Sequence, residues 1–461
     1  MGDHAPHRAG EPLSPPAGET IAAVATPPGR GGIGVVRVSG PAAGAVARGV
    51  LGRLPPPRTA WLAAFRDADG AVIDRGLALW FPAPRSYTGE DVLELHGHGG
   101  PVVLDLLLAR CLALGARPAR PGEFTLRAFL NGKLDLAQAE AVADLIDAAS
   151  AEAARGALRS LEGAFSAEVR ALAEALAALR AEVEAGLDFA DEPLELAAEA
   201  ETARRLAELE ARWRRLRARA AEGAALREGL VVAIVGRPNV GKSSLLNALA
   251  GRETAIVTPI AGTTRDVLRE QILVEGVPLT VLDTAGLRAA DDPVEREGVR
   301  RARAALEGAD HVLLVVEDGA APAAAEAEAA EAAAGRLTVV CNKIDRTGRA
   351  PGPAEHPLGP AVAVSARTGA GLEALARRLA AVAGRGSGTE GVFLARRRHL
   401  EALDRAGAAL AAAAHRHREG LADLVAEELA QAQRALGEIT GEGVDTEALL
   451  GRIFARFCIG K

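Results

Sequence analysis

At 461 residues the chain can form two or three domains, and its 49% hydrophobic and 25% charged residues exclude a fibrous or wholly disordered protein. The net charge of −7 provides no overall basic field for nucleic acid, so any RNA contact must be local. No apolar run is long enough to span a bilayer. Three widely spaced cysteines (Cys111, Cys341 and Cys458) argue against a disulfide framework and favour a reducing, cytoplasmic location.

The first predicted domain follows a polar tail, residues 1–18, which is rich in Pro and Gly and lacks the apolar core of a signal peptide. In residues 19–133, "GIGVVRVSG" and "GLALWFP" are typical of strands. "GPVVLDLLLARCLALGA" is typical of an amphipathic helix that ends at a glycine. We therefore expect an α+β domain here.

The rest of the chain predicts a helical domain with an inserted α/β domain. Residues 134–228 carry apolar side chains at three- and four-residue spacing, which predicts long helices in a bundle. In 229–384, short apolar runs such as "LVVAIVG" and "HVLLVVED" alternate with helical stretches, which predicts a parallel sheet covered on both faces. The Ala/Glu-rich stretch 320–335 favours a solvated helix. Residues 385–461 are helical again.

A phosphate-binding loop is predicted at "GRPNVGKSS", which matches G-x-x-x-x-G-K-[ST] between a strand and a helix. Its glycines let backbone N–H groups face phosphates, Lys242 adds a charge at the β- and γ-phosphates, and the Ser243 hydroxyl can bind Mg²⁺. The loop residues expected at the nucleotide are Asn239, Val240, Gly241, Lys242, Ser243 and Ser244.

Three later motifs predict that the bound nucleotide is GTP. In "DTAG", Asp283 can hold Mg²⁺ through water and the Gly286 N–H can meet the γ-phosphate. In "NKID", the Asp345 carboxylate can accept from two N–H donors of guanine, a pairing that adenine cannot offer, and the Lys343 stem can cover the base. In "SAR", backbone amides can reach the guanine oxygen. The residues expected at the base are Asn342, Lys343, Asp345, Ser365, Ala366 and Arg367.

The switch segment "TPIAGTTRD" lies between the phosphate-binding loop and "DTAG", and its Thr264 or Thr263 should close on Mg²⁺. Leu287 stands where Ras-like GTPases carry the glutamine that orients the attacking water. Glu295 and Arg288 are polar groups that could replace it, although solvated switch charges are the plainer interpretation of both.

The chain resembles the MnmE (TrmE) family of bacterial tRNA wobble-uridine modification GTPases along its whole length. The resemblance rests on long stretches, among them "SYTGEDVLELHGHGG", "RPGEFTLRAFLNGKLDLAQAEAVADLIDA", "GRPNVGKSSLLNALAGRETAIVTPIAGTTRDVLRE", "DTAGLR" and "FCIGK". It implies a tetrahydrofolate-binding N-terminal domain that dimerises, a helical bundle domain and an inserted Ras-like P-loop GTPase domain.

The resemblance also implies a potassium-activated GTPase whose two G domains meet across the switch face. Ser243 and Thr264 would hold Mg²⁺, and Glu295 would orient the hydrolytic water. The oxygens implied for K⁺ belong to Asn239, Thr258, Ile260 and Thr263, and the two threonines count among the nucleotide-binding residues.

For the N-terminal domain, the resemblance places a 5-formyl- or 5,10-methylene-tetrahydrofolate at Arg37, Glu94 and Lys133. Without the resemblance, Arg37 and Glu94 would be ordinary strand charges. Lysine occurs only at positions 133, 242, 343 and 461. The resemblance brings the C-terminus to the folate site, where Lys461 would contact the ligand. Cys458 would then be a nucleophile, a redox thiol or a structural thiol; a frayed tail and a prenylation box are the alternatives for "CIGK".

The implied partners are a second copy of the chain, tRNA and a flavin-dependent MnmG-like protein. The MnmG-like protein would bind the FAD and would form a heterotetramer with this chain. No membrane partner is expected. An RNA-assembly GTPase similar to Era or Der is the first rival, but such a protein should append a basic RNA-binding domain. A folate-dependent aminomethyltransferase with another substrate is the second.

Overall fold

The computed structural model describes residues 18–188, 195–251, 269–283, 309–382, 392–443, 447–454, 457 and 460. The chain forms two compact units, residues 1–143 with 437–461, and residues 144–436. Within the described ranges, no helix combines the length and the apolarity that a membrane span requires.

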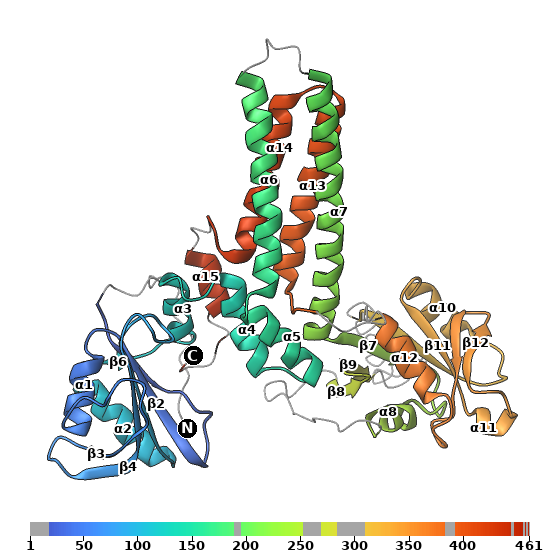
Figure 1. Cartoon of the computed structure of the whole chain (residues 1–461). Helices are drawn as coiled ribbons and strands as arrows, with labels where there is room; N and C mark the ends of the chain where they lie inside the picture. Colours follow the sequence, from blue (N-terminus) through green and yellow to red (C-terminus); the bar gives the residue numbers. More distant parts are fainter. Residues whose placement is uncertain are drawn as a thin grey trace. The chain divides into compact units, whose positions relative to one another are not determined.

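The first unit contains a six-stranded sheet with the order β3-β4-β5-β2-β1-β6 (Figure 1). Its strands are β1 Ile21–Val24, β2 Gly31–Ser39, β3 Trp61–Arg66, β4 Val72–Phe81, β5 Val92–Gly99 and β6 Arg117–Pro118. Helices α1 (Ala43–Leu51) and α2 (Pro101–Ala113) bury their apolar side chains against one face of this sheet. The predicted α+β fold is confirmed, and β2, β4 and α2 coincide with the predicted strands and helix.

The C-terminal segment belongs to this same unit. Helix α15 (Glu447–Phe454) contacts α3 (Glu123–Leu130), which begins after Gly122. Gly122 has a left-handed backbone (φ 67°), and a Cβ there would lie 2.7 Å from the Phe454 carbonyl oxygen, so this close approach requires glycine. Gly460 lies against the backbone of Val24 in β1, where a Cβ would be 2.5 Å from the Val24 oxygen.

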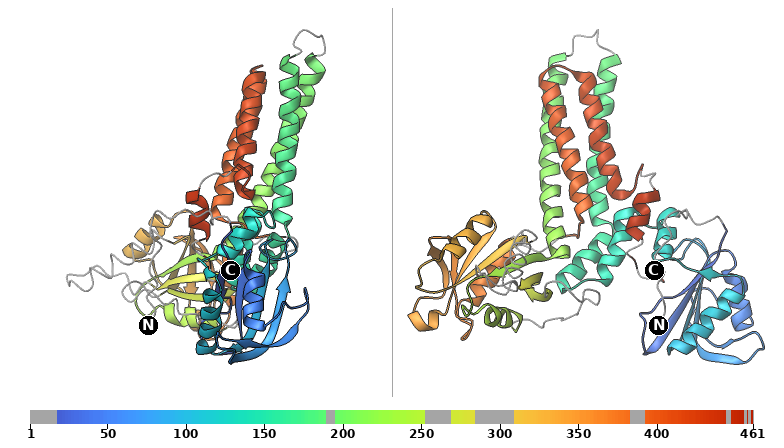
Figure 2. Two further views of the ribbon diagram at one scale, coloured as in Figure 1. Left: turned by 90° about the vertical axis from the view of Figure 1, so that its left-hand side faces the viewer. Right: turned by 180° about the vertical axis from the view of Figure 1, so that it is seen from behind.

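The second unit begins with a helical bundle whose long helices α6, α7, α13 and α14 run side by side (Figures 1 and 2). Its helices outside the α/β section are α5 Ala151–Leu161, α6 Ala164–Asp188, α7 Glu195–Glu228 and α13 Arg397–Arg418, while α4 Leu136–Ile146 and α14 Ala422–Thr440 each include residues of both units. Helices α7 and α13 approach closely at Gly407, whose missing side chain makes room for Trp213. The Trp213 indole N–H donates to the Leu403 carbonyl oxygen (2.7 Å), which satisfies its only donor.

Both connections between the bundle and the α/β section converge on Asp144. Arg227, in the last turn of α7, donates through Nε to Asp144 Oδ1 (2.7 Å). Arg396, where the chain re-enters the bundle, donates through Nη2 to the same oxygen (2.6 Å). The Asp144 side chain is only 7% exposed. This arrangement, which we call the Asp144 clasp, fixes both connections to one carboxylate.

The α/β section of the second unit has a seven-stranded sheet with the order β12-β13-β11-β10-β7-β9-β8. Its elements are β7 Leu230–Val235, α8 Lys242–Ala250, β8 Arg269–Val274, β9 Val277–Asp283, β10 His311–Glu317, α10 Ala324–Ala332, β11 Leu337–Asn342, α11 Ile344–Thr347, β12 Gly352–His356, β13 Gly359–Ala363 and α12 Leu372–Val382. The outer pairs β8–β9 and β12–β13 are antiparallel, and the pairs between them are parallel. Apolar clusters lie on both faces, which explains the continuous apolar runs and confirms the predicted α/β class.

The Ala/Glu-rich stretch forms helix α10, and most of its residues are exposed, as expected for a solvated helix. One face is packed, because Ala329, Ala330 and Glu326 are buried. The Glu326 carboxylate accepts from Arg237 Nε in the phosphate-binding loop (2.8 Å). Because alanine occurs on both sides of this helix, the hydropathy of the two faces differs little, and the sequence does not show which face is packed and which is exposed to solvent.

Candidate functional site

The loop between β7 and α8 is shaped by glycines at positions that exclude a side chain. A Cβ on Gly236 (φ 149°) would lie 2.2 Å from the Val315 oxygen. A Cβ on Gly241 (φ 99°) would lie 2.4 Å from Asn342 Nδ2. Asn239 also has a left-handed backbone (φ 65°), a conformation that asparagine tolerates better than most residues. The loop therefore turns its backbone tightly into the start of α8, as the sequence motif predicts.

Lys242 and the serines that follow it form the first turn of α8. The Lys242 ammonium donates to the carbonyl oxygens of Gly236 (2.9 Å) and Arg237 (3.0 Å), which holds its charge inside the loop. Ser243 and Ser244 are exposed at the N-terminal end of the helix, where the helix dipole favours anions. This end of α8 presents a positive charge, exposed hydroxyls and a helix N-terminus together.

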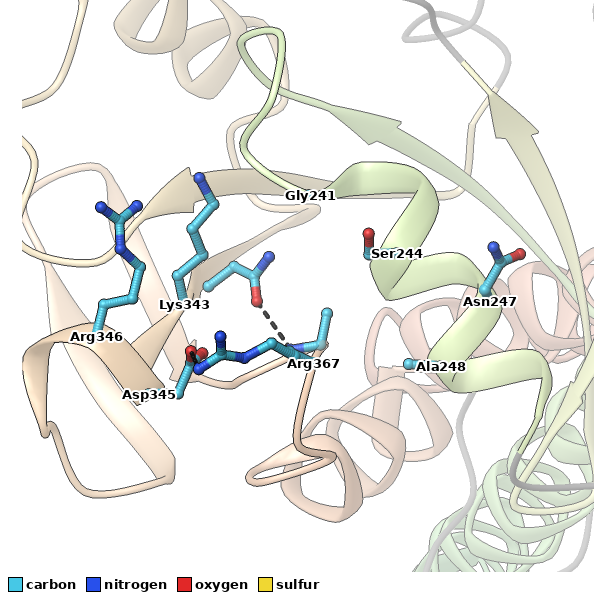
Figure 3. A pocket seen from close by; sticks show the side chains of 10 residues that line it. Gly241, Ser244, Asn247, Ala248, Lys343, Asp345, Arg346 and Arg367 are labelled. Atoms are coloured by element: carbon cyan, nitrogen blue, oxygen red, sulfur yellow. Dashed lines mark hydrogen bonds and ion pairs between the residues drawn. The ribbon is translucent and has the colours of Figure 1, made fainter.

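A cavity of about 660 Å³ opens beside this helix end (Figure 3). Seven of the residues predicted at the nucleotide line it: Gly241, Ser244, Asn342, Lys343, Asp345, Ala366 and Arg367. They come from three segments that are far apart in the sequence, at the carboxyl ends of β11 and β13 and at the start of α8. Ligands of open α/β sheets bind at such carboxyl ends.

Asn342 joins the three segments. Its side chain is buried, and its Nδ2 donates to the Val240 carbonyl oxygen in the phosphate loop (2.8 Å). Its Oδ1 accepts from the Ala366 amide (3.0 Å). One side chain therefore fixes the phosphate loop against the "SAR" turn, and the Ala366 amide, which the sequence assigned to the guanine oxygen, is engaged by Asn342.

Asp345 lies at the rim of the cavity with its carboxylate held on both sides. The Ser365 hydroxyl donates to Asp345 Oδ1 (2.6 Å), and Arg367 forms an ion pair with Oδ2. The hydrogen bond from Ser365, and then the Arg367 charge, lower the pKa of Asp345. Asp345 is thus an oriented, ionised acceptor at neutral pH.

Three residues that line this cavity, Asn247, Ala248 and Arg346, were missed from the sequence, and so was Glu317, which contacts two of its lining residues. Asn247 and Ala248 line it from α8, and their spacing of three and four residues after Ser244 was the available signal. Glu317, at the end of β10, accepts from Lys343 Nζ (2.9 Å) and from Arg346 Nη1 (2.6 Å). Glu317 holds Lys343 beside the cavity, but none of the sequence motifs predicts this role for Glu317.

A second polar cluster lies in the first unit, where Arg37 and Glu94 face each other across β2 and β5. Arg37 Nε donates to Glu94 Oε1 (2.9 Å), and the other Glu94 oxygen contacts His96 Nε2 (3.0 Å). Burial raises the pKa of Glu94, but the hydrogen bond with His96 and the Arg37 charge outweigh it, so the net pKa is lowered. His96 was missed, although a spacing of two residues along a strand places it on the same face as Glu94.

The C-terminal segment reaches this cluster. Arg37 Nη1 donates to the Gly460 carbonyl oxygen (3.2 Å), so one guanidinium contacts both Glu94 and the chain end. Lys133 donates to the Pro84 carbonyl oxygen (3.1 Å), and no contact is recorded between it and Arg37 or Glu94 among the described residues. Arg37 was expected to meet a ligand carboxylate, and here it holds the carboxylate of Glu94.

Several predicted residues fall outside the described part of the chain. These are Thr258, Ile260, Thr263, Thr264, Gly286, Arg288, Glu295, Cys458 and Lys461. Asp283 ends β9 beside Ile234 of β7, but its side chain is also outside the description. No group of three or more His, Cys, Asp or Glu side chains that could hold a metal occurs among the residues described. The predicted Mg²⁺ and K⁺ ligands remain predictions.

Comparison with known proteins covers almost the whole chain. Residues 20–133 match the family model described as the GTP-binding protein TrmE N-terminus, and residues 136–458 match the MnmE helical domain. Three curated relatives share the name tRNA modification GTPase MnmE. The protein from Methylococcus capsulatus is 55% identical over 97% of this chain and 100% of its own length. Those from Sodalis glossinidius (54%) and Pseudomonas paraeruginosa (56%) each cover 96% of this chain and 99% of their own.

Among solved structures, Aquifex aeolicus Era Y63A bound to GDP·AlF4⁻ is 29% identical. It covers 39% of this chain and 66% of its own, with a TM-score of 0.28. That likeness is confined to part of the chain, whereas the curated relatives match 96–97% of it.

Proposed function

Because the chain belongs to the MnmE (TrmE) family and is therefore a tRNA modification GTPase, we propose that it is the GTP-switched component of a two-protein complex in the cytoplasm. With a flavin-dependent MnmG-like partner, which carries the FAD, it adds an aminomethyl or carboxymethylaminomethyl group to carbon 5 of the tRNA wobble uridine. A tetrahydrofolate one-carbon unit is used. Hydrolysis of GTP switches the association of the two G domains of a homodimer.

The observation that carries the GTP assignment is the geometry around Asp345. An ionised carboxylate, fixed by Ser365 and Arg367, can accept from both N–H donors on the Watson–Crick edge of guanine. The Lys343 stem, tethered by Glu317, lies at the same cavity and can cover the base. A site with oriented polar groups discriminates against a base that leaves those groups without hydrogen-bond partners.

The phosphate end of the site fits a nucleotide bound with two cations. Gly241 leaves room for close backbone approach, Lys242 supplies a charge, and the exposed Ser243 hydroxyl can ligate Mg²⁺ at the first turn of α8. Asn239 is exposed on a left-handed turn of the same loop, which suits its carbonyl-type oxygen as a K⁺ ligand. When bound, the cations neutralise the charge that develops during phosphoryl transfer. Thr258, Ile260, Thr263, Thr264 and Glu295 complete this proposal from the switch segments.

The Arg37–Glu94–His96 cluster supports a folate site. Glu94 is ionised and only 17% exposed, so it can accept N–H donors of a pterin ring without much competition from water. Arg37 contacts both Glu94 and the Gly460 carbonyl oxygen, which supports the proposal that Cys458 and Lys461, within two positions of Gly460 in the sequence, act near the one-carbon donor. When bound, the tetrahydrofolate supplies the one-carbon unit.

Exposed apolar side chains on the N-terminal sheet support the homodimer. Leu62 (72% exposed) pairs across strands with Leu77 (41%), and Ile33 of β2 is 69% exposed. Apolar side chains exposed together on a sheet face are typical of a surface that another protein covers. Sedimentation of the Leu62→Glu variant as a monomer, with normal GTP affinity, is the expected result.

The decisive test is steady-state GTP hydrolysis in KCl and, at equal ionic strength, in NaCl. Strong K⁺ dependence that disappears in Asn239→Ala is expected. An unchanged K⁺ dependence in Asn239→Ala would remove this residue from the cation site. Equal rates in both salts would contradict the cation-bridged mechanism and leave an ordinary switch GTPase.

A further inference from the structure

A basic groove lies between α6 and α7, and none of its lining residues belongs to the cavity or the polar cluster described above. It encloses about 260 Å³ and is lined by Arg212, Arg215 and Arg219 of α7 and by Glu168 of α6. Its floor contains Leu172 and Leu216, both almost fully buried. Charges above an apolar floor are less screened than charges surrounded by water.

The groove lies in a stretch of α7 with an unusual charge. Residues 211–221 contain five arginines and no acidic residue, in a chain whose net charge is −7. Three of the five are matched by carboxylates outside or at the end of the groove. The ion pairs are Arg214–Glu210, Arg217–Asp404 and Arg219–Glu168. Arg219 also stacks on Phe393, with its guanidinium carbon 4.8 Å from the ring centre, so it is held in place.

The two remaining arginines are those that face the groove. Arg212 donates through Nη2 to the Ala171 carbonyl oxygen (3.3 Å) and has no carboxylate partner among the described residues. Arg215 has neither a hydrogen bond nor an ion pair within the described part of the chain. A guanidinium has five N–H donors, so both side chains keep most of their donors. Both are exposed, and a spacing of three residues places them on one face of the helix.

We propose that this α6–α7 groove binds backbone phosphates of the tRNA through Arg212 and Arg215. The guanidinium fork matches phosphate oxygens in a bidentate geometry, and two such contacts provide the local attraction that an acidic protein needs to hold RNA. The ion pair Arg219–Glu168 also lines the groove and adds no net charge to it. Phosphate contacts position the RNA and carry no sequence information, so the groove serves every tRNA substrate alike. The inference rests on tRNA being the substrate.

The test measures binding of a fluorescein-labelled tRNA transcript with uridine at the wobble position, by anisotropy, over a series of KCl concentrations. In Arg212→Gln/Arg215→Gln, Kd should rise about tenfold at 100 mM KCl, and the salt slope should fall by about 2. The matched control is Arg204→Gln/Arg214→Gln, which removes the same charge from two arginines of α7 that pair with glutamates outside the groove. It should bind as the wild type does.

A second variant tests the geometry of the contact. Arg212→Lys/Arg215→Lys keeps the charge but loses the fork, so the salt slope should stay and Kd should rise about two- to threefold. Circular dichroism and the thermal midpoint check the fold of each variant. Wild-type affinity and salt slope in the glutamine pair, or an equal loss in the control, would overturn the groove. A wild-type protein without salt-dependent tRNA binding would overturn the groove and the direct tRNA contact together, while the K⁺ test of GTP hydrolysis would stand unaffected.

Discussion

The Asp144 clasp is the feature whose loss should most weaken the bundle, and Asp144→Asn is the perturbation that isolates it. The substitution keeps the shape of the side chain but removes the charge that Arg227 and Arg396 share. Removing one partner of a buried ion pair costs about 3–5 kcal/mol. Arg227 is 28% exposed and can recover water, whereas Arg396 is 12% exposed. We therefore expect a loss of about 2–3 kcal/mol in the free energy of unfolding of the second unit.

The assay must report on this unit alone, because a chain of several parts does not unfold in one step. Of the three tryptophans, Trp213 lies in α7 and the other two lie in the N-terminal sheet. With 5-fluorotryptophan in the protein, the ¹⁹F signal of Trp213, assigned with Trp213→Phe, follows the bundle during urea unfolding. The expected shift of the urea midpoint is about 1 M downward.

The matched control is Asp404→Asn, the same chemical change in an ion pair with Arg217 on the same bundle. Asp404 is 55% exposed, so its loss should cost less than about 1 kcal/mol. A midpoint for Asp144→Asn that equals the midpoint of the control would refute the reasoning, because it would mean that the burial of this carboxylate contributes nothing.

The other predictions concern the nucleotide section. Asp345→Asn should weaken GDP binding by at least about 100-fold in titration calorimetry, since two charge-assisted hydrogen bonds are lost, and a loss below tenfold would contradict the guanine assignment. Gly241→Ala should abolish binding of a fluorescent GDP, because its Cβ would lie 2.4 Å from Asn342 Nδ2 at a φ of 99°; near-normal affinity would show that the loop is more adaptable than described. Burial lowers the pKa of His311 from 6.5 to about 4. As the pH falls, the unfolded chain binds this proton before the folded chain does, so the free energy of unfolding that is present above pH 6.5 decreases toward pH 4, by at most about 3 kcal/mol. His311→Gln should flatten this decrease, measured as the urea midpoint at each pH.

The nucleotide section could be predicted well because its signals are local. Buried strands are continuous apolar runs, and the phosphate loop is a run of glycines whose backbone must adopt φ values that other residues avoid. Each "NKID" or "SAR" motif directly follows a strand, and parallel strands end at one edge of the sheet. The residues therefore meet at the cavity without any long-range information.

What the sequence could not supply are pairings that depend on packing between distant segments. Asp144 meets Arg396 across 252 positions, and Arg37 meets Gly460 across 423, so no period or motif connects them. Only the family resemblance predicted that the C-terminus returns to the N-terminal domain. In the sequence, Glu317 and Arg212 are indistinguishable from ordinary surface charges. Only the residues that surround them in the folded structure indicate a particular role.

The return of residues 437–461 to the first unit has a consequence for the order in which the protein is made. A ribosome releases residues 1–143 first, but the piece that completes their fold emerges only after residues 144–436. At 5–20 residues per second this delay is about 15–60 s. During that time the nucleotide section can finish folding while β1 and α3 still lack Gly460 and Phe454. The nascent N-terminal unit therefore lacks these contacts to β1 and α3 until residues 437–461 have emerged.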